Sequence, residues 1–259
     1  METERVQKSP MPCLAVEMLS KGFRVNGHWS QVLQAISFEV AEGEIVALLG
    51  PSGCGKTTLL NIVAGFLPQD RGRVLVKGQA VAGPGPDRGV VFQEDALFSW
   101  LTVAENVDLG LKRSLGKAVR HDRVKRMLDM VELGDYAGYL PRDISGGMKQ
   151  RVALARVLVL QPMALLMDEP FAALDAQTRS QMHKLVLSLQ NRLQQSVLLV
   201  THDPEEAVKL ADRVLVMEKA PGRLSREFTV GAPRPRQLDS PVLLDLKRAI
   251  ITSLAGSGS

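Results

Sequence analysis

The sequence contains few cysteines, the residues whose disulfides stabilise small secreted proteins. It has only two cysteines among 259 residues, Cys13 and Cys54. Because the two lie far apart in the chain, they do not form a disulfide framework, and a reducing cytosol is the simpler interpretation. Cys54 lies in a glycine-rich loop before a predicted helix, where a thiol pKa can be lowered, so redox control at this position is one hypothesis.

Long apolar runs and strong net charge are also absent. Residues 152–169 come nearest to an uninterrupted apolar stretch, but Arg156, Gln161 and Pro162 break it. We therefore expect a chain that does not span a membrane by itself. Residues 1–18 contain no apolar stretch of signal-peptide length, so we expect no leader. The net charge of +4 is mild and no long basic run occurs, so we expect no nucleic-acid partner.

The chain does have the apolar content of one substantial core, with 45% of its residues apolar. Runs typical of strands occur at residues 14–19, 32–40, 44–49, 73–78, 89–93, 163–169, 196–202, 213–219 and 224–230. Residues 99–160 have an almost purely helical pattern, so we expect an α/β core with a helical insertion. The expected organisation is one domain, 1–259, with the core at 14–96 and 161–230, a helical subdomain at 97–160 and a C-terminal extension at 231–259.

A glycine-rich segment, GPSGCGKTT, lies between the predicted strand at 44–49 and a predicted helix at 56–64. It matches G-x-x-x-x-G-K-[ST] without a gap. Glycines leave backbone N–H groups free to approach an anion, and the helix start adds unpaired N–H groups and a positive dipole end. In this pattern the lysine reaches the β- and γ-phosphates and the final hydroxyl binds Mg²⁺. The alternative is a glycine-rich turn that holds a lysine by chance. The expected nucleotide-binding residues are Gly50, Pro51, Ser52, Gly53, Cys54, Gly55, Lys56, Thr57 and Thr58.

The segment MALLMDEP, residues 163–170, is an apolar strand that ends in two acids. After a P-loop, Asp168 is expected in the Mg²⁺ shell, through water, beside Thr57. Glu169 is expected where it can orient or deprotonate the attacking water. By itself, the pair is equally consistent with a buried strand that leaves the core through polar residues. The P-loop upstream favours the catalytic interpretation.

The segment ISGGMKQRVALARVL, which begins at Ile144, is a second helix start suited to an anion. Ser145 can cap the helix, and Gly146 and Gly147 expose N–H groups. The segment resembles the signature motif of ATP-binding cassette (ABC) ATPases, Leu-Ser-Gly-Gly-Gln followed by a basic residue, Gln and Arg. An isoleucine replaces the leucine here, and Met148 replaces the glutamine. The alternative is a capped helix that only packs.

Other motifs of this family follow in the expected order. Gln93 in GVVFQ matches the Q-loop glutamine, AALD matches the D-loop and ends at Asp175, and His202 in LLVTHD matches the switch histidine. Phe23 falls where an aromatic residue of the family stacks on adenine, and residues 24–30 are expected to form a long loop after it.

The remaining histidines lack such a context. His28, His121 and His183 are therefore interpreted as ordinary residues.

The resemblance covers about residues 14–230 and implies a fold, cofactors and a mechanism. The implied fold is an α/β P-loop NTPase (RecA-like) core with an antiparallel β subdomain and an inserted helical subdomain. The implied cofactors are ATP and Mg²⁺, and two chains would sandwich two ATP molecules. The signature residues Ser145, Gly146, Gly147 and Met148 would contact the ATP of the opposite subunit. The implied catalytic residues are Glu169, His202 and Gln93, and the metal site would combine Thr57, Gln93 and Asp168.

A narrower resemblance concerns the segments GPGPDRGVVFQEDALFSWLTVAENVDLGL and APGRLSREFTV. Both are similar to segments in ATPase subunits of the taurine, aliphatic-sulfonate and nitrate class of bacterial importers. Bicarbonate and thiamine-precursor importers have similar ATPases. This likeness implies transmembrane permease subunits as partners, indirectly a periplasmic or lipoprotein substrate-binding protein, and a peripheral location on the cytoplasmic face of the inner membrane.

Two functions of other classes compete with transport. The first is a DNA-repair or chromosome-organising ATPase, whose head is split by long heptad arms; no sustained heptad run occurs here. The second is an ATP-binding module that does not hydrolyse ATP, and the intact Asp168, Glu169 and His202 argue against it.

The segment EDALFSWLTVAENV, residues 94–107, leads from Gln93 into the predicted helical insertion. It gathers four large apolar residues in a chain with only 4% aromatics: Leu97, Phe98, Trp100 and Leu101. In the family, this region receives a short cytoplasmic helix of the permease. The alternative is that these residues only anchor the helical insertion to the core.

Overall fold

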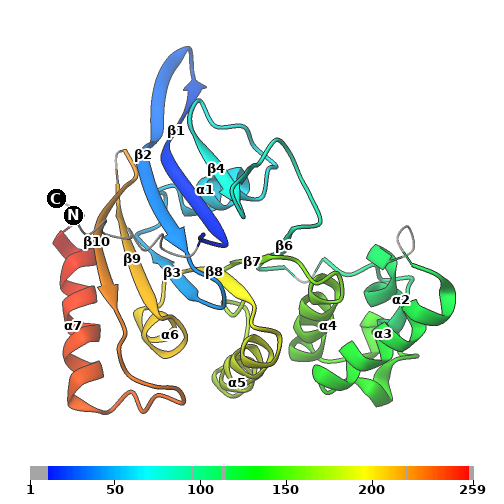
Figure 1. Cartoon of the computed structure of the whole chain (residues 1–259). Coiled ribbons are helices and arrows are strands. Elements are labelled where there is room, and N and C mark those ends of the chain that lie inside the picture. Colours follow the sequence, from blue (N-terminus) through cyan, green and yellow to red (C-terminus); the bar gives the residue numbers. More distant parts are fainter. Residues whose placement is uncertain (1–10, 95, 112–114, 220, 257–259) are drawn as a thin grey trace, which may run out of the picture.

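A sheet of six strands forms the centre of the molecule (Figure 1), a computed structural model that describes residues 11–94, 96–111, 115–219 and 221–256. The strand order is β10-β9-β3-β8-β7-β6, and only β10 is antiparallel to its neighbour. Because parallel strands are covered on both faces, β3 and β8 are buried along their whole length. The strands are β3 (Ile45–Leu49), β6 (Arg88–Val91), β7 (Ala164–Asp168), β8 (Ser196–Thr201), β9 (Arg213–Glu218) and β10 (Arg223–Thr229).

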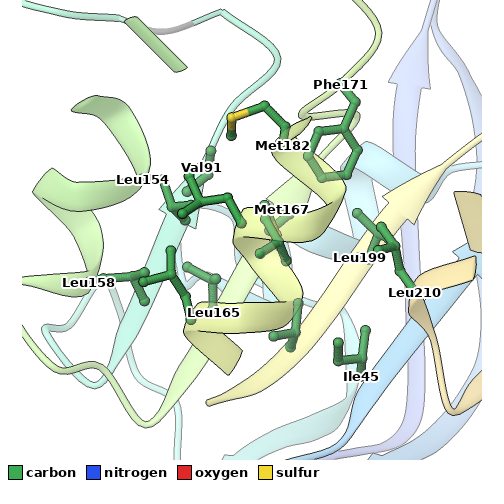
Figure 2. Close-up of a cluster of buried hydrophobic side chains, with 14 of the residues drawn as sticks. Ile45, Val91, Leu154, Leu158, Leu165, Met167, Phe171, Met182, Leu199 and Leu210 are labelled. Carbon is green, nitrogen blue, oxygen red and sulfur yellow. The ribbon is translucent and has the colours of Figure 1, made fainter. Parts of the chain in front are cut away.

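The two faces of this sheet pack against different layers. On β3, Val46 and Leu48 join a core with α1 and the second sheet, whereas Ile45 and Leu49 join a core with the helices of the opposite face. Figure 2 shows part of the latter core, where Leu154 approaches the sheet. Because successive side chains of a strand point to opposite faces of the sheet, the apolar residues of β3 are divided between two cores. The helices against the sheet are α1 (Lys56–Val63), α4 (Gly146–Leu158), α5 (Ala176–Leu193), α6 (Pro204–Leu210) and α7 (Pro241–Gly256).

A second sheet is antiparallel and has the order β2-β1-β4-β5. The prediction of a long loop over residues 24–30 is wrong. Strand β1 continues to Val25 and β2 begins at His28, so that Asn26 and Gly27 alone form the turn. Their φ angles of 51° and 80° are those of a tight hairpin turn, for which Asn-Gly is the usual sequence. The strands are β1 (Leu14–Val25), β2 (His28–Val40), β4 (Arg71–Val76) and β5 (Gln79–Ala80).

A group of helices lies beyond the β6 edge of the central sheet (Figure 1). The helical pattern predicted for residues 99–160 is confirmed, and so is the α/β fold with an antiparallel β subdomain and inserted helices. In the described part of the chain, no helix is both long and apolar enough to cross a bilayer. The inserted helices are α2 (Val103–Asp108), η1 (Leu109–Leu111), α3 (Lys117–Met130), η2 (Gly134–Tyr136), η3 (Pro141–Asp143) and α4 (Gly146–Leu158).

The parallel strands bring four predicted site segments to one edge of the sheet. Strand β3 leads into Gly50, β7 ends at Asp168, β8 ends at Thr201, and Gln93 follows the end of β6 by two residues. The carboxyl ends of parallel strands meet at the same edge, which is where open α/β sheets place their ligand sites.

Candidate active site

The P-loop folds tightly between β3 and α1. Gly53 and Gly55 have φ angles of 80° and 100°, a left-handed conformation that residues with a Cβ rarely adopt. A Cβ on Gly50 would lie 2.7 Å from the sulfur of Cys54, and one on Gly55 would lie 2.6 Å from a methyl carbon of Leu33. Glycine is therefore required at these positions by backbone conformation and by the space that the loop leaves.

Lys56 is the first residue of α1 and is 6% exposed. Its Nζ donates hydrogen bonds to the carbonyl oxygens of Gly50, at 2.7 Å, and Pro51, at 3.2 Å. The ammonium group is thus held against the first residues of the loop, at the positive end of the helix dipole. Loop, helix start and lysine form one electropositive site for an anion.

The buried thiol of Cys54 belongs to the same loop. Burial raises its pKa, although the charge of Lys56 opposes this effect. A raised thiol pKa lowers the thiolate fraction, which is the reactive form. The geometry therefore argues against the hypothesis of redox control at Cys54.

Asp168 lies at the end of β7, opposite the start of α1. Burial raises the pKa of Asp168, although the nearby Thr57 hydroxyl opposes this effect. Its Oδ1 atom is buried and has no hydrogen-bond partner among the described residues. A buried carboxylate oxygen without a partner, beside a threonine hydroxyl, fits a hard cation such as Mg²⁺.

Glu169 and His202 are brought together from two adjacent strands. The Oε2 atom of Glu169 lies 3.0 Å from Nδ1 of His202, across 33 positions of sequence. The backbone N–H of Glu169 donates to the carbonyl of Val200 at 2.9 Å, so the parallel register sets this contact. Glu169 has a φ of 45°, and such strain in a residue other than glycine is typical of functional sites.

Gln93 is exposed at the same edge, two residues after β6. Its neighbour Phe92 is 41% exposed and stacks on Phe66, which is 49% exposed, with a centroid distance of 6.2 Å. Gln93 therefore follows a small exposed aromatic surface, at the beginning of the connection to the helical insertion.

The signature residues lie on the other side of the central sheet from α1, at the start of α4 (Figure 1). Ser145 caps α4, and its hydroxyl accepts from the Met148 N–H at 3.3 Å. A Cβ on Gly146 would meet no atom within 4 Å, whereas one on Gly147 would lie 2.4 Å from the methyl of Thr178. One face of this helix start is therefore exposed and the other packs on α5, while the side chain of Met148 packs against the core.

Asp175, the predicted D-loop residue, caps α5. Its carboxylate accepts from the backbone N–H groups of Gln177 and Thr178, both at 3.0 Å, and from the Thr178 hydroxyl at 2.6 Å. These bonds, the Thr178 hydroxyl first, hold the pKa of Asp175 below its usual value. Because Thr178 also packs on Gly147, the D-loop cap and the signature segment are neighbours in one chain.

Phe23, the predicted adenine-stacking residue, is half-buried on β1. The Nζ of Lys21 lies 5.3 Å from its ring centroid and 2.8 Å from Asp70. Trp29, across the hairpin, packs on Gly22, where a Cβ would lie 2.4 Å from the indole. Strands were predicted only at residues 14–19 and 32–40, so the end of the hairpin that holds Phe23 and Trp29 was missed; the signal for it was the Asn-Gly dipeptide.

The segment of residues 96–102, here called the aromatic loop, is organised by a buried asparagine that the sequence did not single out. Asn106 is fully buried, and its Nδ2 donates to the carbonyls of Phe98, Leu101 and Thr102 at 3.0–3.1 Å. Its Oδ1 accepts from the Phe98 N–H at 2.9 Å. A single amide thus fixes the backbone of the loop.

This loop presents its largest side chain outward. Trp100 is 73% exposed, and its ring meets the ring of Phe98 edge-on at 5.4 Å. The guanidinium of Arg156 lies 5.9 Å from the Phe98 ring, and its Nη1 donates to the carbonyl of Ala96 at 2.8 Å. Phe98 therefore anchors the loop to α4, while Trp100 is not part of the core.

Comparison with known families agrees with this geometry. A family model described as "ABC transporter" matches residues 33–172, which include the P-loop and both acids at the end of β7. The chain belongs to the ABC transporter family. It is an ATP-binding subunit that hydrolyses ATP to drive transport.

Individual relatives extend over most of the chain. It is 45% identical over 225 residues to the taurine import ATP-binding protein TauB of Pseudomonas aeruginosa, covering 86% of each chain. It is 46% identical over 217 residues to the nitrate import ATP-binding protein NrtD of Synechocystis sp., covering 83% of this chain and 82% of that protein. Among solved structures, a dimeric post-hydrolysis state of the ATP-binding cassette MJ0796 bound to ADP and Pi matches with a TM-score of 0.73 and 29% identity, over 85% of this chain and 100% of that one.

Proposed function

We propose that this chain is the ATPase subunit of a bacterial ABC importer for a small anion or sulfonate, such as taurine, an alkanesulfonate or nitrate. The observation that carries the proposal is the identity of 45–46% with a taurine and a nitrate import ATPase, over 82–86% of each chain. Substrate passes through other subunits, so bicarbonate and a thiamine precursor are the competing importer substrates. The alternative of another class, a regulatory module that binds ATP without transport, is disfavoured by the membership of the ABC transporter family.

In the proposed reaction, the P-loop holds the triphosphate. The loop N–H groups and Lys56 bind the β- and γ-phosphates, and Phe23 stacks on adenine. Glu169 orients or deprotonates the attacking water, and His202, in contact with Glu169 at 3.0 Å, is placed to contact the γ-phosphate. Catalysis of phosphoryl transfer consists mainly of such positioning and charge stabilisation.

The proposed metal is Mg²⁺, held by Thr57, by Gln93 and, through water, by Asp168. The described residues contain no cluster of three or more carboxylate, histidine and cysteine ligands. This agrees with Mg²⁺, which usually takes one or two protein ligands, substrate phosphates and water. The bound ion would neutralise charge on the β- and γ-phosphates.

A second copy of the chain is the proposed partner at the nucleotide. Within one chain, the signature segment and the P-loop lie on opposite sides of the central sheet. Ser145 and Gly146 are exposed and free to face outward. We infer that two chains bind two ATP molecules between them, with Ser145, Gly146, Gly147 and Met148 of one chain against the nucleotide of the other.

The aromatic loop is the proposed docking surface for a transmembrane permease, which places the chain at the cytoplasmic face of the inner membrane. An exposed aromatic surface, with Trp100 projecting from a loop fixed by Asn106, is typical of partner sites. A periplasmic or lipoprotein substrate-binding protein would act through the permease.

Uptake measurements test the proposed substrate class. The gene is disrupted in its bacterium and restored either as wild type or as Lys56→Ala. Loss of labelled taurine, alkanesulfonate or nitrate uptake that only the wild-type copy restores supports the proposal. Loss confined to bicarbonate or thiamine-precursor uptake would contradict the proposed substrate class, but it would still support an importer. Unchanged uptake of all of these compounds would mean that the transported substrate lies outside this set, which would contradict the proposal.

A further inference from the structure

A buried ionic cluster adjoins the strand end that carries His202. Glu206 of α6 and His183 of α5 are only 5% and 4% exposed. Thr201 Oγ1 donates to Glu206 Oε2 at 2.7 Å. The other carboxylate oxygen, Oε1, lies 3.6 Å from His183 Nε2 and 3.8 Å from Arg179 Nε. Groups from two helices and a strand therefore converge on one carboxylate.

A carboxylate buried to this extent is costly unless its charge is compensated. Burial raises the pKa of Glu206, but the interactions with His183, Thr201 and Arg179 outweigh burial, so that this pKa lies below its usual value. Glu206 is therefore ionised at neutral pH. The Thr201 contact is a charge-assisted hydrogen bond, which is stronger than a neutral one, and Arg179 and His183 lie within ion-pair distance of the carboxylate.

At one end, the cluster holds the residues on either side of His202. The hydroxyl of Thr201, which donates to Glu206, also accepts from the Asp203 N–H at 3.1 Å. Asp203 in turn caps α6 by accepting from the Glu205 N–H at 2.8 Å. The backbone on both sides of His202 is thereby tied to the buried carboxylate.

At the other end, the cluster reaches the D-loop. The Nη2 of Arg179 donates to the carbonyl oxygen of Leu174 at 2.8 Å, and the Arg179 N–H donates to the carbonyl of Asp175 within α5. One carboxylate, Glu206, thus contacts groups that bond both the D-loop and the switch-histidine loop.

The histidine completes this cluster on the side of β7. His183 meets the ring of Phe171 edge-on at 4.7 Å, and Phe171 follows Glu169 by two residues. Neither ring nitrogen has a hydrogen-bond partner among the described residues. A buried imidazole without hydrogen bonds is unfavourable, and the Glu206 carboxylate lies 3.6 Å from its Nε2, within ion-pair distance.

We propose that Glu206 is a positioning residue which, through Thr201, Arg179 and His183, holds the D-loop and the switch-histidine loop together so that His202 stays against Glu169. It acts on the reaction through other residues and does not touch the nucleotide. The proposal rests on the roles proposed above for Glu169 and His202.

The test compares Glu206→Gln with Glu205→Gln in the full chain. Glu205 is the adjacent residue on α6, exposed and paired with Lys247 at 2.8 Å, so it controls for loss of a carboxylate from this helix. The measurements are kcat and KM for ATP, and amide hydrogen exchange of residues 172–175 and 201–203. Glu169→Gln and His202→Ala are assayed in parallel.

The expected result for Glu206→Gln is a kcat lowered by roughly tenfold, with KM for ATP within about threefold of wild type, because misplaced catalytic groups slow the reaction and the P-loop is not in contact with Glu206. Exchange should become faster in both loops together. Glu205→Gln should change none of these values. A folded Glu206→Gln with wild-type kcat, or with faster exchange in α6 alone, would overturn the proposal.

A second variant guards against failure to fold. Arg179→Gln breaks the bond to Leu174 at a side chain that is 34% exposed and leaves Glu206 paired with Thr201 and His183. It should speed exchange in residues 172–175 and lower kcat severalfold; unchanged values for both would contradict the link to the D-loop. If His202→Ala keeps wild-type activity while Glu206→Gln is slow, the proposed role of His202 fails, and with it the route by which Glu206 acts.

Discussion

Two glycine-rich helix starts in this molecule, the P-loop before α1 and the signature segment before α4, differ in how far their own chain completes them. In the P-loop, Lys56 is buried and donates to the Gly50 carbonyl, and the Thr57 hydroxyl lies near Asp168. In the signature segment, Ser145 only caps its helix, and an added Cβ on Gly146 would meet no atom within 4 Å. The first, the proposed phosphate site, is organised by its own chain, whereas the second is an exposed surface, as its proposed contact with the nucleotide of a second chain requires.

The largest expected effect tests the P-loop. Lys56→Ala should weaken MgATP binding at least roughly a hundredfold, because a buried lysine–phosphate contact is charge-assisted. Isothermal titration calorimetry measures this, with Lys125→Ala, an exposed lysine on α3, as the control. Wild-type affinity of Lys56→Ala for MgATP would contradict the proposal that the P-loop is the phosphate site.

A second experiment stops the reaction while both half-sites stay intact. Glu169→Gln keeps the shape of the side chain and removes its charge, so it should bind ATP and hydrolyse it roughly a hundredfold or more slowly. Size-exclusion chromatography with MgATP should then show a dimer, with ADP as the control nucleotide. An active Glu169→Gln enzyme would exclude Glu169 as general base, and a monomer with MgATP would argue against the two-chain site.

The signature segment is tested by substitutions at two neighbouring positions. Ser145→Arg places bulk on the exposed face and should nearly abolish hydrolysis, whereas Met148→Gln should change kcat by less than about threefold, because the backbone N–H groups remain. Ser145→Ala removes the hydroxyl and its cap, worth about 1 kcal/mol of stability, without adding bulk, so it separates loss of the hydroxyl from the steric effect of arginine. Comparable losses in Ser145→Arg and Met148→Gln would mean that the side chain at position 148 matters more than the backbone.

Asp168 should show a conflict between function and stability. Burial raises the pKa of Asp168 in the folded chain. Its ionised carboxylate therefore destabilises the nucleotide-free fold at pH values above this pKa. The destabilisation disappears once the pH falls below the pKa that Asp168 has in the unfolded chain. Asp168→Asn should therefore raise Tm at pH 7 by roughly 2–4 °C and raise it less at low pH, while hydrolysis is lost. Calorimetric scans at both pH values check this; a lower Tm at pH 7 would contradict it.

The smallest effect on the isolated chain is expected at the aromatic loop. Because Trp100 is 73% exposed, Trp100→Ala should leave ATP binding and folding nearly intact, yet weaken co-purification with the permease and uncouple transport from hydrolysis. Trp29→Ala, at the other exposed tryptophan, is the control. Unfolding of the isolated Trp100→Ala chain, with normal assembly of the surviving protein, would show that Trp100 belongs to the core.

Sequence reasoning was most successful where a feature depends on residues that are close along the chain. The P-loop turn, the start of α1 at Lys56 and the cap of α4 at Ser145 were all predicted and are all present. The hairpin at Asn26 was predictable by the same logic but was missed, because residues 24–30 were expected to form a long loop and the Asn-Gly turn signal within them was not used. His183 was set aside as ordinary, since nothing near it in sequence shows that Glu206 lies 3.6 Å away.

The sequence by itself determined the pieces: buried strands, a glycine-rich anion loop, two acids after a strand, and a capped helix. Each depends on backbone conformation and on hydrogen bonds over a few residues, which local side chains decide. Only the tertiary structure decided which pieces meet. Parallel register placed Glu169 against His202, and packing left Trp100 exposed. The turn at Gly222 fits against the carbonyl of Cys54 so closely that a Cβ would lie 2.1 Å away. Contacts of this kind depend on how elements pack in space, which a pattern along one segment does not encode.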